Sequence, residues 1–150
     1  LVSSYFIKEL KNVVKNGIKI SIIGEISRLP KNLRGILKKT VSKTKQNKKI
    51  EVILAINYGS KKELVNTFKK IYKKNITEKT IKKNLYTNKI PDPEILIRTG
   101  GKKRLSNFML WQLAYSELYF LNKLWPDFSP IDLKKIITDY HKIKRNFGNI

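Results

Sequence analysis

Apolar residues recur along the chain at two spacings, one typical of helices and the other of strands. Intervals of three and four residues predict helices over residues 2–14, 33–41 and 64–72, a short helix capped by Thr77, and a last helix that starts at Ser129-Pro130. Runs rich in β-branched residues predict strands over residues 18–23, 50–56 and 94–98, each followed by a loop that contains glycine.

The order of these elements predicts an α/β fold. Helices alternate with strands at the spacing of βαβ crossovers, which favours a parallel β-sheet flanked by helices on both faces. No internal repeat or linker divides the chain, so residues 1–150 are expected to lie in a single domain. Ligands of parallel sheets bind beyond the carboxyl ends of the strands. The loops after Ile23, at Asn57–Ser60 and at Thr99–Gly101 are therefore the first candidates for a site.

Composition excludes several classes of protein. The 150 residues are 41% hydrophobic, enough for a core, and no apolar run reaches the roughly 20 residues of a membrane span. The absence of cysteine excludes disulfides, thiolate metal sites and a cysteine nucleophile, and the single histidine, His141, argues against a histidine relay. No secretory leader is visible at the start, so a cytoplasmic location is expected.

The formal net charge of +22 has more than one interpretation. A polyanion such as a nucleic acid binds basic proteins through counterion release. Only five of the 33 basic side chains are arginines, however, and the lysines are dispersed over helix faces that the pattern predicts to be solvated. A lysine-coated surface is the simplest interpretation, with a bias towards anionic lipid or phosphorylated substrates as a further one.

The segment from Ile97 to Phe108 contains the strongest candidates for ligand-binding residues. Arg98 ends a strand, two glycines follow, and Arg104 and Ser106 come next, with Ser106 at a predicted helix start. Two guanidinium groups, a hydroxyl and helix-end amides would suit a diphosphate. The alternative is an Arg98–carboxylate pair beside an ordinary Gly-Gly turn.

Residues 108–120 are almost entirely apolar, and Glu117 is the only charged residue among them. A carboxylate in apolar surroundings needs a partner. Glu117 either pairs with Arg or Lys or holds a hard cation such as Mg²⁺. The pattern leaves open whether residues 115–120 continue a helix or form a strand. Two weaker candidates are Glu63 and His141. Glu63 could reach the cleft but is expected at a solvated helix N-terminus, and His141 is expected to be exposed and without a catalytic role. Residues 125–128 predict a packed turn.

These segments resemble the signatures of the cis-prenyltransferase family, which includes undecaprenyl diphosphate synthase. The resemblance rests on residues 97–101, 104–108, 110–112, 114–115, 117–120 and 124–128, with weaker similarity at 22–24 and 57–59. It implies an undecaprenyl diphosphate synthase-like α/β fold with a hydrophobic tunnel. It also implies a transferase that condenses isopentenyl diphosphate with an allylic diphosphate, such as farnesyl diphosphate, into a Z-polyprenyl diphosphate, a precursor of the lipid carrier for cell-wall units.

The resemblance also implies roles for particular residues and partners. Arg98, Arg104, Leu105 and Ser106 would bind isopentenyl diphosphate, and Glu117 would be a ligand of the cofactor Mg²⁺. A homodimer in the cytoplasm is expected, with peripheral association with the inner face of the membrane as a further expectation. No specific nucleic acid partner is implied.

The chain departs from the family pattern at several positions. The Asp-Gly-Asn-Gly-Arg-Trp motif, which carries the catalytic Asp, is absent from these residues, so the chain is expected to be a C-terminal portion, incomplete at its N-terminus and inactive alone. Two alternatives remain, a non-catalytic prenyltransferase subunit and a basic nucleic-acid-binding module. The individual departures are Ser60 for Gly, Lys102 for an acidic residue, Lys103 for His, and Asn146-Phe147-Gly148 for Arg-x-Gly, with Arg145 as a substitute.

Overall fold

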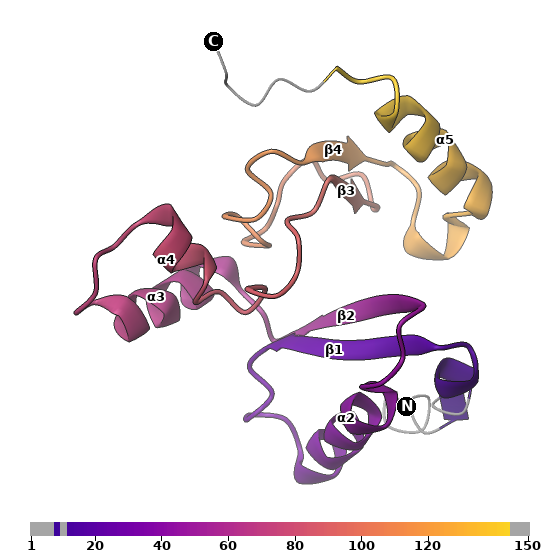
Figure 1. Ribbon diagram of the computed structural model, residues 1–150. Coiled ribbons are helices and arrows are strands. Elements are labelled where there is room, and N and C mark those ends of the chain that lie inside the picture. The colour runs from indigo at the N-terminus through magenta and orange to yellow at the C-terminus, as the bar shows by residue number, and fades with distance from the viewer. Residues whose placement is uncertain (1–7, 10–11, 145–150) are drawn as a thin grey trace. The chain divides into compact units, whose positions relative to one another are not determined.

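The computed structural model describes residues 8–9 and 12–144, which form two compact units divided after Tyr86 (Figure 1). The first unit contains β1 (Ile18–Gly24), α2 (Lys31–Thr44), β2 (Ile50–Ile56), α3 (Ser60–Ile71) and α4 (Glu78–Lys82). The second contains β3 (Ile95–Arg98), β4 (Glu117–Phe120), the 3-10 helix η1 (Trp125–Asp127) and α5 (Pro130–Tyr140). That the two units belong to one domain, and their strands to one sheet, stays a prediction.

The predicted elements agree closely with the observed ones where local signals are strong. β2 has the predicted bounds, and β1 and β3 differ from theirs by one residue. Thr77 caps α4 by accepting a hydrogen bond from the Thr80 amide, and Ser129 and Asp132 form a capping box at the start of α5. Of the first predicted helix, residues 8–9 and 12–15 are helical, whereas its apolar positions Val2, Phe6 and Leu10 lie outside the described residues.

Both strand pairs are parallel. β1 runs beside β2 in a register that aligns Ile18 with Ile50 and Gly24 with Ile56, and α2 connects the two strands and packs against β1. In the second unit, β3 and β4 align Ile95 with Glu117. A parallel pair needs a crossover connection, which α2 supplies in the first unit. The predicted parallel strands with flanking helices are therefore confirmed.

Coverage of the strands is less complete than predicted. Ile50 and Val52 of β2 are 56% and 38% exposed, because α2 is the one described element with extensive contact to this strand pair and it packs against β1. The expected turn at residues 125–128 is present as η1, and the rings of Trp125 and Phe128 stack at 5.7 Å. It is not a packed turn, since Trp125 is 71% exposed.

Among the described residues, no helix is both long enough and apolar enough to cross a bilayer.

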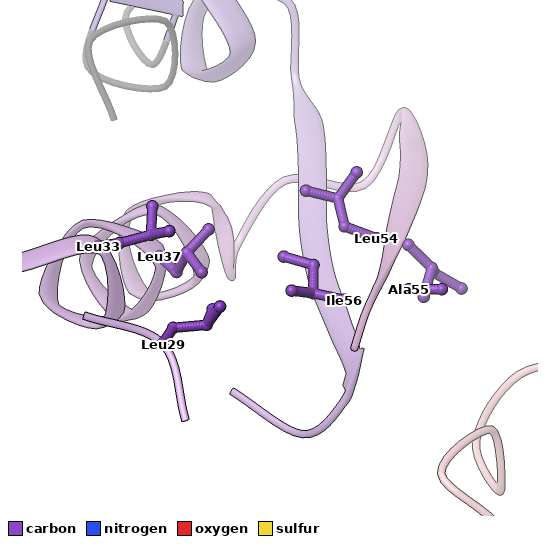
Figure 2. A pocket seen from close by; sticks show the side chains of 7 residues that line it. Leu29, Leu33, Leu37, Leu54, Ala55 and Ile56 are labelled. Carbon is purple, nitrogen blue, oxygen red and sulfur yellow. The ribbon is translucent and has the colours of Figure 1, made fainter. Parts of the chain in front are cut away.

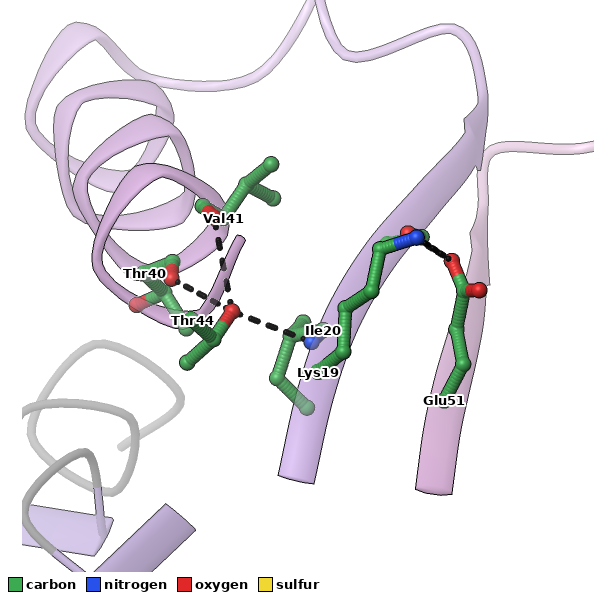
Figure 3. A network of polar contacts seen from close by, with 7 residues as sticks. Lys19, Ile20, Thr40, Val41, Thr44 and Glu51 are labelled. Atoms are coloured by element: carbon green, nitrogen blue, oxygen red, sulfur yellow. Dashed lines mark hydrogen bonds and ion pairs between the residues drawn. The ribbon is translucent and has the colours of Figure 1, made fainter. Parts of the chain in front are cut away.

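The C-terminal end of α2 satisfies the free edge of β1. The buried Thr44 hydroxyl accepts a hydrogen bond from the Ile20 amide at 3.0 Å and donates to the Thr40 carbonyl at 2.9 Å (Figure 3). The Asn47 side chain donates to the Ile18 carbonyl at 2.8 Å. An unpaired backbone group on a sheet edge is costly when it is buried. These two side chains therefore fix α2 against the edge of the strand pair.

Replacing Thr44 tests this link. We expect Thr44→Val to lower the free energy of unfolding by about 1–3 kcal/mol, because the Ile20 amide loses its acceptor in a buried position. Thr40→Val is the matched control: Thr40 is equally buried in α2, but its hydroxyl bonds only to the Ile36 carbonyl of its own helix. Urea unfolding measures both variants, and equal losses of stability would contradict the assignment.

Candidate functional site: a cation cluster after β3

Two guanidinium groups meet at one hydroxyl oxygen beyond the carboxyl end of β3. Arg98 is the last residue of that strand, and its Nη1 donates to Ser106 Oγ at 3.0 Å and to the Arg104 carbonyl. Arg104 Nε donates to the same Ser106 Oγ at 3.2 Å. The structure thus brings together three of the residues that the sequence singled out for a diphosphate. Leu105 lies between them, half-buried, and its carbonyl accepts from the Phe108 amide.

This cluster lacks a counter-charge among the described residues. The alternative interpretation pairs Arg98 with a carboxylate, but the hydrogen-bond partners of both guanidinium groups in the described chain are a carbonyl and a hydroxyl oxygen. Lys102 and Lys103, both exposed, add two further positive charges to the same loop. Two guanidinium groups that share an acceptor repel each other, so the arrangement favours binding of an anion.

The loop that carries the cluster is anchored to the chain after β4. The amide of Gly100 donates to the Lys123 carbonyl at 2.7 Å, and that of Gly101 donates to the Leu121 carbonyl at 2.9 Å. Both glycines adopt left-handed conformations, with φ of +87° and +70°. Side chains rarely adopt such angles, which explains why the turn uses glycine.

The predicted helix start at Ser106 is wrong. Ser106, Asn107 and Met109 have φ of 49°, 63° and 44°, and residues 106–115 form consecutive turns instead of a helix. Three left-handed residues among four cannot belong to a right-handed α-helix. Helix-end amides are therefore not part of the cluster. Beyond these turns the chain forms β4, which settles the open question about residues 115–120.

The structure does not bring Glu117 to the cation cluster. Glu117 begins β4 and aligns with Ile95, whereas Arg98 aligns with Phe120. Three residues along a strand correspond to about 10 Å. The backbone of Glu117 therefore lies at the opposite end of the strand pair from that of Arg98.

Glu117 can supply one metal ligand. Within the described chain it forms no ion pair with Lys or Arg, and no group of three or more His, Asp or Glu side chains could hold a metal ion. Mg²⁺ is often bound by one or two carboxylates, with water and substrate phosphates as its other ligands. A single carboxylate fits that mode of binding. Burial raises the pKa of nearby Tyr119, and the negative charges of Asp139 and Glu117 raise it further.

The start of α5 stabilises the segment to which the glycine loop is anchored. Lys123 Nζ lies 2.6 Å from Asp132 Oδ1, and the Ser129 amide and hydroxyl donate to Oδ2 at 2.9 and 2.7 Å. These interactions, the Lys123 hydrogen bond first, hold the pKa of Asp132 well below its usual range. Since the Lys123 carbonyl also accepts from Gly100, the cation cluster is linked to the α5 cap through one residue.

The first unit contains an apolar pocket of about 510 Å³ between α2 and the strand pair (Figure 2). Its lining residues are Leu29, Leu33, Leu37, Ile53, Leu54, Ala55 and Ile56. Figure 2 shows the leucines of α2 on one wall and Leu54 and Ile56 on the other. A pocket without charged lining residues suits a hydrocarbon group.

One acidic residue lies in a different environment from the predicted one. Glu63, expected at a solvated helix N-terminus, is 1% exposed, because α3 turns this side of its first turn inward. Tyr58 Oη donates to Glu63 Oε2 at 2.5 Å, and the Tyr86 amide donates to Oε1 at 2.6 Å. The buried residues of α3 recur at intervals of three and four and mark its inward face: Ser60, Glu63, Thr67 and Ile71. Three of the four are polar, so the hydrophobic pattern of the sequence does not reveal this face. His141 is exposed just after α5, as expected.

Several predicted departures from the family pattern can be located. Ser60 is fully buried as the first residue of α3, and Lys102 and Lys103 are exposed. Arg145, Asn146, Phe147 and Gly148 lie outside the described residues.

Comparison with known proteins identifies the class as prenyltransferases. Residues 1–148 match the family described as "Putative undecaprenyl diphosphate synthase". An isoprenyl transferase of Rickettsia sibirica is 44% identical over 151 residues, which cover 99% of this chain and 67% of the relative. One of Fusobacterium nucleatum is 43% identical, with 97% and 64% of the two chains covered.

Solved structures show the same fold. Lavandulyl diphosphate synthase from Lavandula x intermedia, solved in complex with dimethylallyl diphosphate, gives a TM-score of 0.91 at 36% identity, over 98% of this chain and 68% of that one. A probable undecaprenyl diphosphate synthase from Campylobacter jejuni gives 0.89 at 32% identity, over 99% and 71%.

The chain therefore belongs to the undecaprenyl diphosphate synthase family of prenyltransferases. The predicted resemblance and the undecaprenyl diphosphate synthase-like α/β fold are both confirmed. The chain spans about two thirds of the length of the curated relatives it matches.

The Asp132 cap predicts a pH dependence. Because the pKa of Asp132 is lower in the folded chain than in the unfolded one, about 3.9, its contribution to stability is complete above that value and is lost as the pH falls below it. We expect the thermal midpoint of Asp132→Asn to be lower than that of the unmodified chain at pH 7, and the difference to narrow progressively as the pH falls below about 4 towards the lower pKa of the folded chain. Asp139→Asn, on the same helix, is the control. A difference that stays constant from pH 7 to about pH 2 would contradict the prediction.

Proposed function

We propose that the full-length protein condenses isopentenyl diphosphate with an allylic diphosphate, such as farnesyl diphosphate, to form a Z-polyprenyl diphosphate. The product would be the precursor of a lipid carrier for cell-wall units. The observation that carries this proposal is the convergence of Arg98 and Arg104 on Ser106 Oγ without a carboxylate among the described residues. Membership of a prenyltransferase family supports the reaction class.

The cluster would bind the diphosphate of isopentenyl diphosphate. Guanidinium groups donate parallel hydrogen bonds to phosphate oxygens, and the Ser106 hydroxyl can donate a further one. The bond between Ser106 and each arginine would then give way to bonds with phosphate. Leu105, half-buried between Arg104 and Ser106, would hold the loop in this geometry.

The chemistry requires charge stabilisation and exclusion of water. The alkene of isopentenyl diphosphate attacks the allylic carbon, a C–C bond forms, and the allylic C–O bond breaks with its electron pair leaving on diphosphate. Loss of a proton from the isopentenyl unit completes the new double bond. Binding fixes the two substrates head to tail, and apolar walls keep water from the developing cation.

Glu117 would hold Mg²⁺ through its carboxylate. When bound, the metal would neutralise the charge that builds up on the leaving diphosphate. The apolar pocket of the first unit would receive the hydrocarbon part of the allylic substrate and of the growing chain, since its lining residues are all apolar. No catalytic residue is assigned in this chain.

Two partners are proposed from exposed surfaces. A second copy would cover the apolar surface of η1 and α5, where Leu124, Trp125 and Ile131 are 62%, 71% and 80% exposed. Peripheral association with the inner face of the cytoplasmic membrane is supported by Phe68 and Tyr72 of the lysine-rich α3 segment, which are 41% and 69% exposed. Sedimentation of the full-length protein, with and without anionic vesicles, tests both; a monomer that stays in the supernatant would contradict them.

Substitution of Arg98 and Glu117 in the full-length protein tests the function. We expect Arg98→Ala to raise the KM for isopentenyl diphosphate about 10- to 100-fold, the loss of a charge-assisted hydrogen bond of roughly 1.5–3 kcal/mol. Glu117→Gln should lower kcat and weaken the response to Mg²⁺. Incorporation of labelled isopentenyl diphosphate measures both.

Two controls accompany this experiment. Lys39→Ala removes an exposed positive charge from α2 and should leave both constants unchanged. Residues 1–150 alone should give no elongation, because they lack the Asp-Gly-Asn-Gly-Arg-Trp motif. Full activity of Arg98→Ala and Glu117→Gln would refute the site, and elongation by residues 1–150 alone would refute the expected inactivity.

A further inference from the structure

Glu63 is the one acidic side chain that is fully buried among the described residues. Burial of a carboxylate is costly unless hydrogen bonds compensate for lost water. Both of its oxygens accept such bonds, Oε2 from the Tyr58 hydroxyl at 2.5 Å and Oε1 from the Tyr86 amide at 2.6 Å. The carboxylate therefore joins two segments that are far apart in the sequence.

The Tyr86 side of this link is held independently of Glu63. Asn66 Nδ2 donates to Tyr86 Oη at 2.9 Å, and Thr67 Oγ1 donates to the Asn84 carbonyl at 3.3 Å. The Lys70 amino group also lies 5.9 Å from the centre of the Tyr86 ring. Residues 84–86 are thus tied to α3 by several contacts, and they form a fixed support for Glu63.

The Tyr58 side of the link lies at the carboxyl end of β2. Tyr58 belongs to the turn Asn57–Gly59, in which Asn57 has a left-handed φ of 47°. Asn57 exchanges hydrogen bonds with Glu25, its side chain donating to the Glu25 carbonyl at 3.2 Å. The Tyr58 ring also meets the Tyr86 ring edge to face, with 6.4 Å between their centres.

Close packing makes this turn sensitive to small shifts. A Cβ atom on Gly24, which ends β1, would lie 2.2 Å from the Ile56 carbonyl oxygen and 3.1 Å from Tyr58 Cα. The backbones of the two strands thus touch where the turn begins. Ile56, the residue before the turn, lines the apolar pocket. A displaced Tyr58 would therefore alter both the carboxyl edge of the strand pair and the wall of the pocket.

We propose that Glu63 is a positioning residue: by holding the Tyr58 hydroxyl against the Tyr86 amide, it fixes the Asn57–Gly59 turn and the adjoining end of the apolar pocket for the allylic substrate. This inference rests on the proposed function for the identity of the substrate. The residue itself does not touch substrate and acts through Tyr58.

Two substitutions in the full-length protein test the role. Tyr58→Phe removes the hydroxyl and keeps the ring, and Glu63→Gln keeps the shape but weakens the acceptor pair. We expect each to raise the KM for farnesyl diphosphate about tenfold and to leave the KM for isopentenyl diphosphate within about twofold of its original value. The double variant should be no worse than the poorer single one, since both substitutions act on the same Tyr58–Glu63 bond.

Thr67→Val is the matched control. Thr67 is as buried as Glu63 and lies on the same helix, but its hydroxyl donates to the Asn84 carbonyl of the same support instead of binding Tyr58. A purely structural role for Glu63 predicts that all three variants change both KM values alike, in proportion to their loss of thermal stability. That outcome, or unchanged KM values in Tyr58→Phe and Glu63→Gln, would overturn the proposal.

A second measurement separates this proposal from the proposed function. If the unmodified full-length protein does not elongate farnesyl diphosphate, the proposed function fails. Hydrogen exchange of the Asn57–Gly59 amides then decides the positioning role: faster exchange at these amides in Tyr58→Phe, but not in Thr67→Val, supports it, and unchanged exchange overturns it. If Glu63→Gln does not fold, Tyr58→Phe alone gives the answer.

Discussion

Two positively charged groups that share one acceptor need either a counter-ion or an anionic ligand. The loop after β3 contains such a pair of guanidinium groups. Arg98 and Arg104 both donate to Ser106 Oγ, and the described residues supply no carboxylate to balance them. Electrostatic repulsion between two guanidinium groups is reduced when an anion lies between them. The local stability of this loop and its proposed binding of a diphosphate therefore depend on the same repulsion between the two guanidinium groups.

The backbone around the cluster is built to tolerate that repulsion. Left-handed residues at Gly100, Gly101, Ser106 and Asn107 turn the chain back on itself within a few positions. Such conformations persist only where the surroundings hold them, and here the amides of both glycines donate to the chain after β4. The Lys123–Asp132 pair in turn holds that chain against α5. The conformation of the loop after β3 thus depends on the capping box that Ser129 and Asp132 form at the start of α5.

Local sequence signals account for most of the fold but only part of the site. The isoleucine-rich runs and the Ser129-Pro130 start are decided by neighbouring residues, so β1, β2 and α5 could be predicted closely. Ser106, Asn107 and Met109 adopt positive φ without a glycine to signal it in the sequence, so an apolar pattern typical of a helix forms turns instead. The register of β4 against β3, which separates Glu117 from Arg98, likewise cannot be predicted from local sequence signals. Burial of Glu63 was missed because its partners, Tyr58 and Tyr86, come from two different loops.

The distribution of charge, more than its total, distinguishes a site for one compact anion from a surface for a polyanion. Lysines account for most of the net charge of +22 and are spread over exposed helix faces. Two of only five arginines, by contrast, converge on a single hydroxyl. A nucleic acid presents phosphates at regular intervals and is bound best by a stripe of positive charges. A diphosphate is a compact anion and is bound best where positive groups converge at one point. The convergence of the arginines in the second unit therefore favours the proposed diphosphate over a nucleic acid.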